Sequence, residues 1–102
     1  MVLGTAVGLV IGGKIAEVLD KDEEKDFSQK IQESLENNPD NMPSEWTSKK
    51  NKNINAEILP TSSYKIDNQT CRDFKQIISK DGKQIEEEST ACRDEEGNWK
   101  II

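Results

Sequence analysis

Two cysteines placed symmetrically about a turn constrain the fold more than any other feature of this chain. Cys71 and Cys92 flank the dipeptide Asp81-Gly82 at equal distances. Asp-Gly between two strand-like runs is the strongest short signal for a two-residue β-hairpin, because type I′ turns need positive φ at both positions. Folding the chain there places Cys71 opposite Cys92 at a non-hydrogen-bonded pair, where Cα atoms lie about 4.5 Å apart. A disulfide tolerates Cα separations of roughly 4.4–6.8 Å, so the sequence predicts a cross-strand disulfide.

The alternatives for the two cysteines are free thiols and a metal or redox pair. A zinc site needs four ligands in closely spaced pairs, and the chain has two cysteines and no histidine. Thioredoxin-like chemistry needs C-x-x-C, which is absent. We therefore prefer a structural disulfide. It indicates an oxidising compartment, in the cell envelope or beyond.

Composition limits both the core and the function. The 102 residues are 32% apolar and 33% charged, which predicts one small domain with a small core. A net charge of −6 argues against nucleic acid as a partner, and against anionic membrane surfaces for the water-exposed part. Without histidine the commonest general base and the Ser-His-Asp triad are missing. We expect a protein with no catalytic or metal-binding residues and no cofactor, and not an enzyme.

Residues 1–19 differ from the rest of the chain. The first thirteen residues carry no charge, and Gly4, Gly8 and Gly12 recur at every fourth position. On a helix this spacing forms a glycine face that lets another backbone approach closely. Spanning a bilayer takes about 20 residues, so the run is a marginal span even when it continues through Leu19. We expect a membrane-associating zipper helix that self-associates through its glycine face, with a targeting remnant or a buried helix as alternatives.

Residues 20–38 are predicted to form an acidic amphipathic helix. Asp20 and Glu23 have the spacing of a capping box, and Asn38-Pro39 ends the pattern. The apolar stripe repeats every fourth residue, at Phe27, Ile31 and Leu35.

Residues 39–102 are predicted to form an antiparallel β domain. Apolar residues alternate with polar ones, and turn residues separate the runs. The expected strands are 44–49, 53–59, 63–67, 69–80, 83–93 and 97–102. Short connections require antiparallel neighbours, which makes the last three strands a meander. The predicted fold class is α+β: an N-terminal helical region followed by a small antiparallel sheet with one disulfide.

The hairpin register also assigns its two faces. Phe74, Ile78, Ile85 and Ala91 share the apolar face. The cysteines lie on the opposite, mostly polar face, so we expect the disulfide near solvent. Arg72 and Arg93 each follow a cysteine onto the apolar side. We expect solvated arginines there, and pairing with carboxylates or with the C-terminus of the chain is the alternative. With Trp99 they form the candidate interaction surface.

Three passages together resemble a known family, the rickettsial seventeen-kilodalton surface antigens and their relatives. The passages are GTAVGLVIGGKIAEVLDKDEEKDF, QTCRDFKQIISKDGKQ and STACRDEEGNWKII. They are similar to the family's second glycine-zipper segment, its Cys-Arg strand with a glycine turn, and its closing signature. The family usually has a signal peptide, a lipid-attachment cysteine and two zipper segments. We therefore expect either an N-terminally truncated chain or reliance on one zipper helix.

The resemblance implies a cell-envelope location, with the outer membrane facing the periplasm or the surface, and no catalytic residues. We expect a non-enzymatic, membrane-associated surface antigen with a structural or interaction role. The alternative is an anchored periplasmic binding or inhibitor module that uses the surface of the β domain.

Overall fold

The computed structural model describes residues 10–102 as two helices and five strands. The predicted α+β class is confirmed. In chain order the elements are α1 (Gly13–Ala16), α2 (Lys21–Asn37), β1 (Ser44–Thr47), β2 (Ile54–Ile66), β3 (Gln69–Lys80), β4 (Lys83–Arg93) and β5 (Trp99–Ile101).

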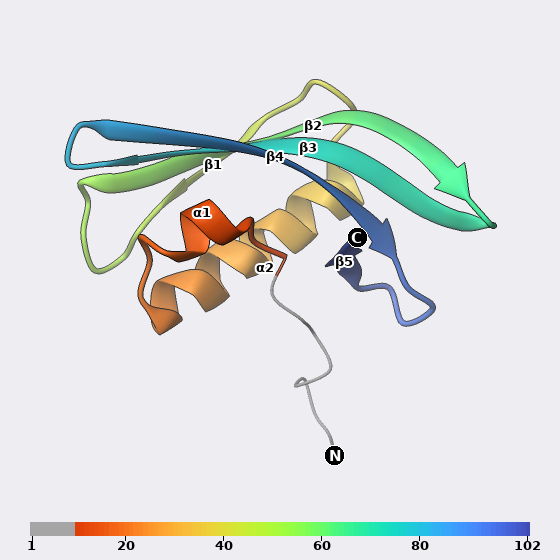
Figure 1. Ribbon diagram of the computed structural model, residues 1–102, viewed down its shortest axis with the longest axis horizontal. Coiled ribbons are helices and arrows are strands. Elements are labelled where there is room, and N and C mark those ends of the chain that lie inside the picture. Colours follow the sequence, from red (N-terminus) through yellow and green to blue (C-terminus); the bar gives the residue numbers. More distant parts are fainter. Residues whose placement is uncertain (1–9) are drawn as a thin grey trace, which may run out of the picture.

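The strands form one antiparallel meander in the order β1-β2-β3-β4-β5. Both helices cover the same face of the sheet, so the opposite face is open (Figure 1). The prediction of separate strands at 53–59 and 63–67 is wrong, because both belong to β2. Pro60 does not end the strand, since the register shifts between Pro60 and Ser62. Proline is tolerated at such a bulge because its missing N–H removes no regular ladder bond there.

Helix α2 begins and ends where the sequence predicts. The capping box is present: Asp20 accepts a 2.8 Å hydrogen bond from the Glu23 amide, and Glu23 accepts a 3.0 Å bond from the Asp20 amide. The three residues of the apolar stripe, Phe27, Ile31 and Leu35, are all buried. They pack against the covered face of the sheet as one layer of a two-layer core.

The strands supply the other layer of the core, and both tryptophans belong to it. Phe27 and Trp46 pack with ring centroids 4.9 Å apart and ring planes tilted by 50°, within the range of centroid distances of aromatic pairs. The buried apolar residues of the five strands are Trp46, Ile54, Ala56, Ile58, Phe74, Ile78, Ala91 and Trp99, and Ile85 packs beside them partly buried. The predicted apolar face of the main hairpin is confirmed.

The N-terminal helix prediction fails over the residues that the structure describes. Gly4 and Gly8 lie outside them. Gly12 is extended, with φ −66° and ψ 148°, and precedes the short α1. Residues 10–19 are part of the folded domain, because Val10, Ile15 and Leu19 are buried in the same core as α2. Within residues 10–102, every helix is too short or too polar to cross a membrane.

The main hairpin has the predicted register. Cys71 lies opposite Cys92 with Cα atoms 3.9 Å apart, and the two form a disulfide. The expected solvent exposure is wrong, because the side chains are 0% and 4% exposed. Tyr64 of β2 pairs with Cys71, and Lys100 of β5 pairs with Cys92. Both cysteines therefore lie on strands that have a neighbouring strand on each flank, which limits the access of solvent to the bridge.

Removing the disulfide should lower stability without changing the register. The bridge joins residues 21 positions apart, and closing a loop of that size stabilises by about 3 kcal/mol in the chain-entropy description. We expect C71A/C92A to lose about that much unfolding free energy in urea. Reduced wild type is the matched control. Hydrogen exchange should keep the β3–β4 pattern, since the Asp81-Gly82 turn sets it. Unchanged stability in both samples would contradict this account.

Candidate functional site

A groove of about 480 Å³ lies at the C-terminal end of α2, and all three predicted interaction residues line it. Arg72 comes from β3, Arg93 ends β4 and Trp99 begins β5. We call this feature the helix-end groove. The other residues that line it are Leu35, Glu36, Asn38, Pro39, Asp40, Ser63 and Thr70.

Arg72 caps the end of α2 from the sheet. The side chain is buried, and its Nη1 donates a 2.7 Å hydrogen bond to the carbonyl oxygen of Leu35. Nη2 donates to Asp40 Oδ1 at 2.9 Å. The last turn of α2 contains no basic residue of its own. A helix C-terminus has unpaired carbonyls and a partial negative charge, so Arg72 supplies the cation that the helix sequence lacks.

Arg93 and Trp99 hold the neighbouring turn of α2 through a shared acceptor. Glu36 Oε1 accepts from Arg93 Nε at 2.9 Å and from Trp99 Nε1 at 3.1 Å. The hydrogen bond from Arg93, followed by that from Trp99, holds the pKa of Glu36 below its ordinary 4.5. Gln32 exchanges two further bonds with the Trp99 backbone, at 2.7 and 2.8 Å. Arg72 thus pairs with Asp40 and Arg93 with Glu36, so the alternative of pairing with carboxylates holds for both in place of the expected solvated arginines.

Most of the side chains that line the helix-end groove are buried or already paired. Trp99 is 3% exposed and cannot stack against a bound molecule, and Arg72 is 6% exposed. Arg93 remains about half-exposed beside Glu36. Asp40 is also occupied: hydrogen bonds from Ser63 and then Arg72 lower its pKa below 3.8. The groove therefore presents paired charges and hydroxyl groups, which suit an uncharged polar ligand better than a free anion.

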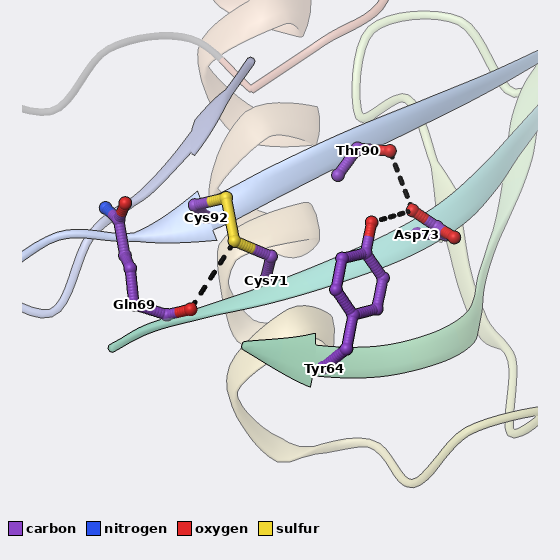
Figure 2. Close-up of a disulfide and its surroundings, with 6 residues drawn as sticks. All are labelled: Tyr64, Gln69, Cys71, Asp73, Thr90 and Cys92. Atoms are coloured by element: carbon purple, nitrogen blue, oxygen red, sulfur yellow. Dashed lines mark hydrogen bonds between the residues drawn. A yellow bond between two sulfur atoms is a disulfide. The ribbon is translucent and has the colours of Figure 1, made fainter. Parts of the chain in front are cut away.

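A second polar cluster lies on the open face beside the disulfide. Asp73 Oδ1 accepts from the Tyr64 hydroxyl at 2.6 Å and from Thr90 Oγ1 at 2.7 Å (Figure 2). These bonds, Tyr64 first, lower the pKa of Asp73, and the same bond raises the pKa of Tyr64. The cluster ties β2, β3 and β4 together two residues from Cys71.

Sequence reasoning missed the acceptors of the site. Gln32, Glu36 and Asp40 look like ordinary surface residues of a helix and its exit loop, and no spacing distinguishes them. Tyr64 falls in the strand expected at 63–67, and the sequence gives its hydroxyl no partner. Only the packing of α2 across the sheet reveals these partners. Within residues 10–102, no three His, Cys, Asp or Glu side chains are grouped to hold a metal ion.

The comparisons with known proteins agree on one family. Residues 33–100 match a family described as the 17 kDa outer membrane surface antigen. The chain is 29% identical over 85 residues to the 17 kDa surface antigen of Rickettsia bellii strain RML369-C, covering 82% of this chain and 53% of that protein. It is 31% identical over 72 residues to the 17 kDa surface antigen of Rickettsia prowazekii strain Madrid E, covering 70% and 45%. The chain thus spans about half the length of these curated relatives. No solved structure matches it.

Removing the guanidinium of Arg72 should cost much more than removing that of Arg93. R72M leaves the Leu35 carbonyl and Asp40 without their buried partner, and we expect a loss of about 2–4 kcal/mol in unfolding free energy. R93M breaks a half-exposed pair and should cost at most about 1 kcal/mol. Urea unfolding of the two matched variants measures the difference. Equal losses would show that Arg72 does not hold the helix end.

Acid should lower the stability of the fold, because several carboxylates accept hydrogen bonds in the folded state. The pKa values of Glu36, Asp40 and Asp73 are lowered on folding. Their stabilising contribution is therefore complete above the ordinary carboxyl pKa and is lost as pH falls through the lower folded values. We expect the urea midpoint to decrease below about pH 4.

Two variants test the assignment of this acid loss. Y64F removes the larger cause of the lowered pKa of Asp73, and D73N removes the titrating group. Both should lose less stability than wild type between neutral pH and pH values below about 4. An acid loss as steep as that of wild type in both variants would exclude Asp73 as a contributor.

Proposed function

Because this chain belongs to the 17 kDa outer membrane surface antigen family, we propose that it is a non-enzymatic surface antigen of a Gram-negative cell envelope. The observation that carries the proposal is the family match over residues 33–100. That range runs from the last residues of α2 through nearly the whole sheet. We call α2 and the five-stranded sheet together the head. The relatives are named as surface antigens, which implies a cell-surface or envelope location.

The buried disulfide supports an envelope location. Cys71 and Cys92 are joined in the head and shielded from solvent. Structural disulfides form and persist in oxidising compartments and are rare in the cytosol. For a head with so small a core, the bridge contributes a large part of a typical net stability.

The proposed attachment is to the outer membrane through the apolar segment at the start of the chain. Gly4 and Gly8 retain zipper spacing, and the run containing them carries no charge. Self-association through that glycine face is the proposed mode of assembly. Gly12 plays another part, since it is extended and precedes α1.

A second candidate function is an anchored periplasmic binding or inhibitor module. The observation that favours it is the helix-end groove, where Arg72, Arg93 and Trp99 come together from three strands. The head would then recognise a partner through hydroxyls and paired charges, and the N-terminal segment would serve only as an anchor.

Cell fractionation of the full chain tests the envelope proposal. We expect the protein in the outer-membrane fraction, accessible to a membrane-impermeant amine label, with both thiols protected from alkylation. C71S/C92S controls for the alkylation readout. Recovery in the cytosol with both thiols free would overturn the proposal.

A groove-filling variant separates the two candidate functions. Thr70 lines the helix-end groove, so T70W should abolish saturable capture of a defined envelope protein by the full chain if the groove binds it. T47W, on an exposed position of β1, is the matched control. Capture unaffected by T70W, or absent in wild type, would remove the support for the binding module.

A further inference from the structure

The outer edge of β4 has a neighbouring strand along only part of its length. β4 runs from Lys83 to Arg93, and β5 pairs with it over residues 91–93 alone (Figure 1). One further backbone bond, from the Ile102 amide to the Thr90 carbonyl at 3.0 Å, ends this contact. Within residues 10–102, no strand pairs with residues 83–89 on the outer side. We call residues 83–89 the free edge.

The register of the hairpin identifies the unpaired backbone groups of the free edge. Residue pairs of an antiparallel ladder alternate between hydrogen-bonded and non-hydrogen-bonded, and the second kind has the closer Cα atoms. The pair of Cys71 and Cys92, with Cα atoms 3.9 Å apart, is of the second kind. Every second residue of β4 counted back from Cys92 therefore has its N–H and C=O directed away from β3.

The outward residues of the free edge are Gln84, Glu86 and Glu88. The bond that the Thr90 carbonyl accepts from Ile102 agrees with this assignment, because Thr90 belongs to the same series. No other loop or element in the described part of the chain bonds to the backbone of the three outward residues. They leave a row of donors and acceptors of the kind to which a further strand can pair.

The other edges of the sheet have structural protection that the free edge lacks. Short strands, prolines, bulges and charged residues all hinder the pairing of an edge with another chain. β1 and β5 are short, and β2 has Pro60 and a register shift just beyond the end of β1. The free edge has no proline, and its pairing with β3 runs without a register shift. Its protection is the charge of residues 86–88, which are three glutamates.

One of these glutamates is used inside the fold. Glu87 lies opposite Gln76 on the face that the helices cover. Its Oε1 accepts a 3.0 Å hydrogen bond from the Lys14 amide, and Gln76 Oε1 accepts one from the Gly12 amide at 3.2 Å. The chain itself therefore occupies the covered side of the free edge, and recognition of a partner by charge depends on the open side.

Glu86 and Glu88 make the open side of the free edge negative. Both side chains are exposed, and because they lie two positions apart they project from the same face of β4. Lys75 Nζ lies 3.6 Å from Glu86 Oε2 in a partly exposed pair, which contributes little. Glu88 forms no ion pair with any described residue. The two carboxylates are thus accessible to cations of another chain.

We propose that the free edge binds an extended basic segment of a partner protein, which adds one more strand to the sheet. Backbone bonds to the three outward residues supply affinity, and Lys or Arg at alternate positions of the segment lie opposite Glu86 and Glu88. A second copy of the chain is a poor occupant, because two antiparallel β4 strands would set these glutamates against each other. The same charges exclude self-pairing and select a basic strand. The surface is separate from the helix-end groove, which no residue of the free edge lines.

Titration of the isotope-labelled full chain with a synthetic peptide tests the proposal. Acetyl-Ser-Lys-Thr-Lys-Val-Thr-amide, placed antiparallel to β4, sets its two lysines opposite Glu88 and Glu86. We expect saturable changes in the amide NMR signals of the free edge. Hydrogen exchange at the outward amides should be fast in the free chain and slow in the complex, whereas Ile85 and Glu87, which bond to β3, should be protected in both. Absence of a saturable change, or outward amides already protected without peptide, would overturn the proposal.

Modified peptides test the backbone bonds and the charges separately. N-methylation of both lysine amides removes donors that face β4 and should abolish binding. N-methylation of the intervening threonine and of the valine alters amides that face away and should be tolerated. Replacing both lysines with glutamate should weaken binding at least about tenfold, because two attractive cross-strand pairs become repulsive. Equal binding of all these peptides would contradict strand addition.

Two charge-reversal variants separate the free edge from the net charge of the chain. E86K/E88K should reverse the preference, so that the glutamate peptide binds more tightly than the lysine peptide. E95K/E96K makes the same change in net charge at exposed positions of the turn after β4 and should leave the preference for the lysine peptide in place. Equal losses in the two variants would overturn the free edge as the site. Changes at the outward amides with protein concentration alone would identify a second copy as the occupant and would also overturn the proposal.

Discussion

The register between β3 and β4 is the constraint on which the rest of this structure depends. It places Cys71, Asp73 and Thr90 on the open face, and Arg72, Phe74 and Gln76 on the face that meets the helices. A slip by one residue would exchange these sets, because side chains alternate across a strand. The disulfide, the cap on α2 and the acceptor for Gly12 would then fail together.

How well each feature could be predicted follows from the range of the interactions behind it. The β3–β4 register depends on the local turn Asp81-Gly82, and the start of α2 depends on a capping box within one turn of helix, so the sequence predicts both. Burial of the disulfide depends on β2 and β5, which flank the hairpin and place Tyr64 and Lys100 opposite the two cysteines. The partner of Arg72 is a backbone carbonyl of a helix 37 positions away. No pattern in the sequence encodes such contacts, because they arise only when α2 packs on the sheet.

Glycine spacing shows why a pattern can have two physical origins. Small residues at every fourth position suit a helix interface, and a single glycine also suits any place where a side chain would collide. Gly12 satisfies the first criterion in sequence and the second in the structure, where Glu87 occupies the space of a Cβ. The spacing predicts that other groups approach closely, without specifying whether they come from another helix or from the same chain.

The internal use of polar groups limits how this head can recognise a partner. At the helix-end groove, Arg72 already donates to the Leu35 carbonyl and to Asp40, and Arg93 already donates to Glu36. A ligand that displaced these bonds would have to replace each one, since an unpaired buried group costs about 1–3 kcal/mol. A partner at the groove would therefore bind best by adding hydrogen bonds to Thr70 or Arg93. The bonds of the two arginines to the end of α2 would then stay intact. If the second candidate function holds, the same bonds that fix the fold would thus favour a partner that binds without rearranging it.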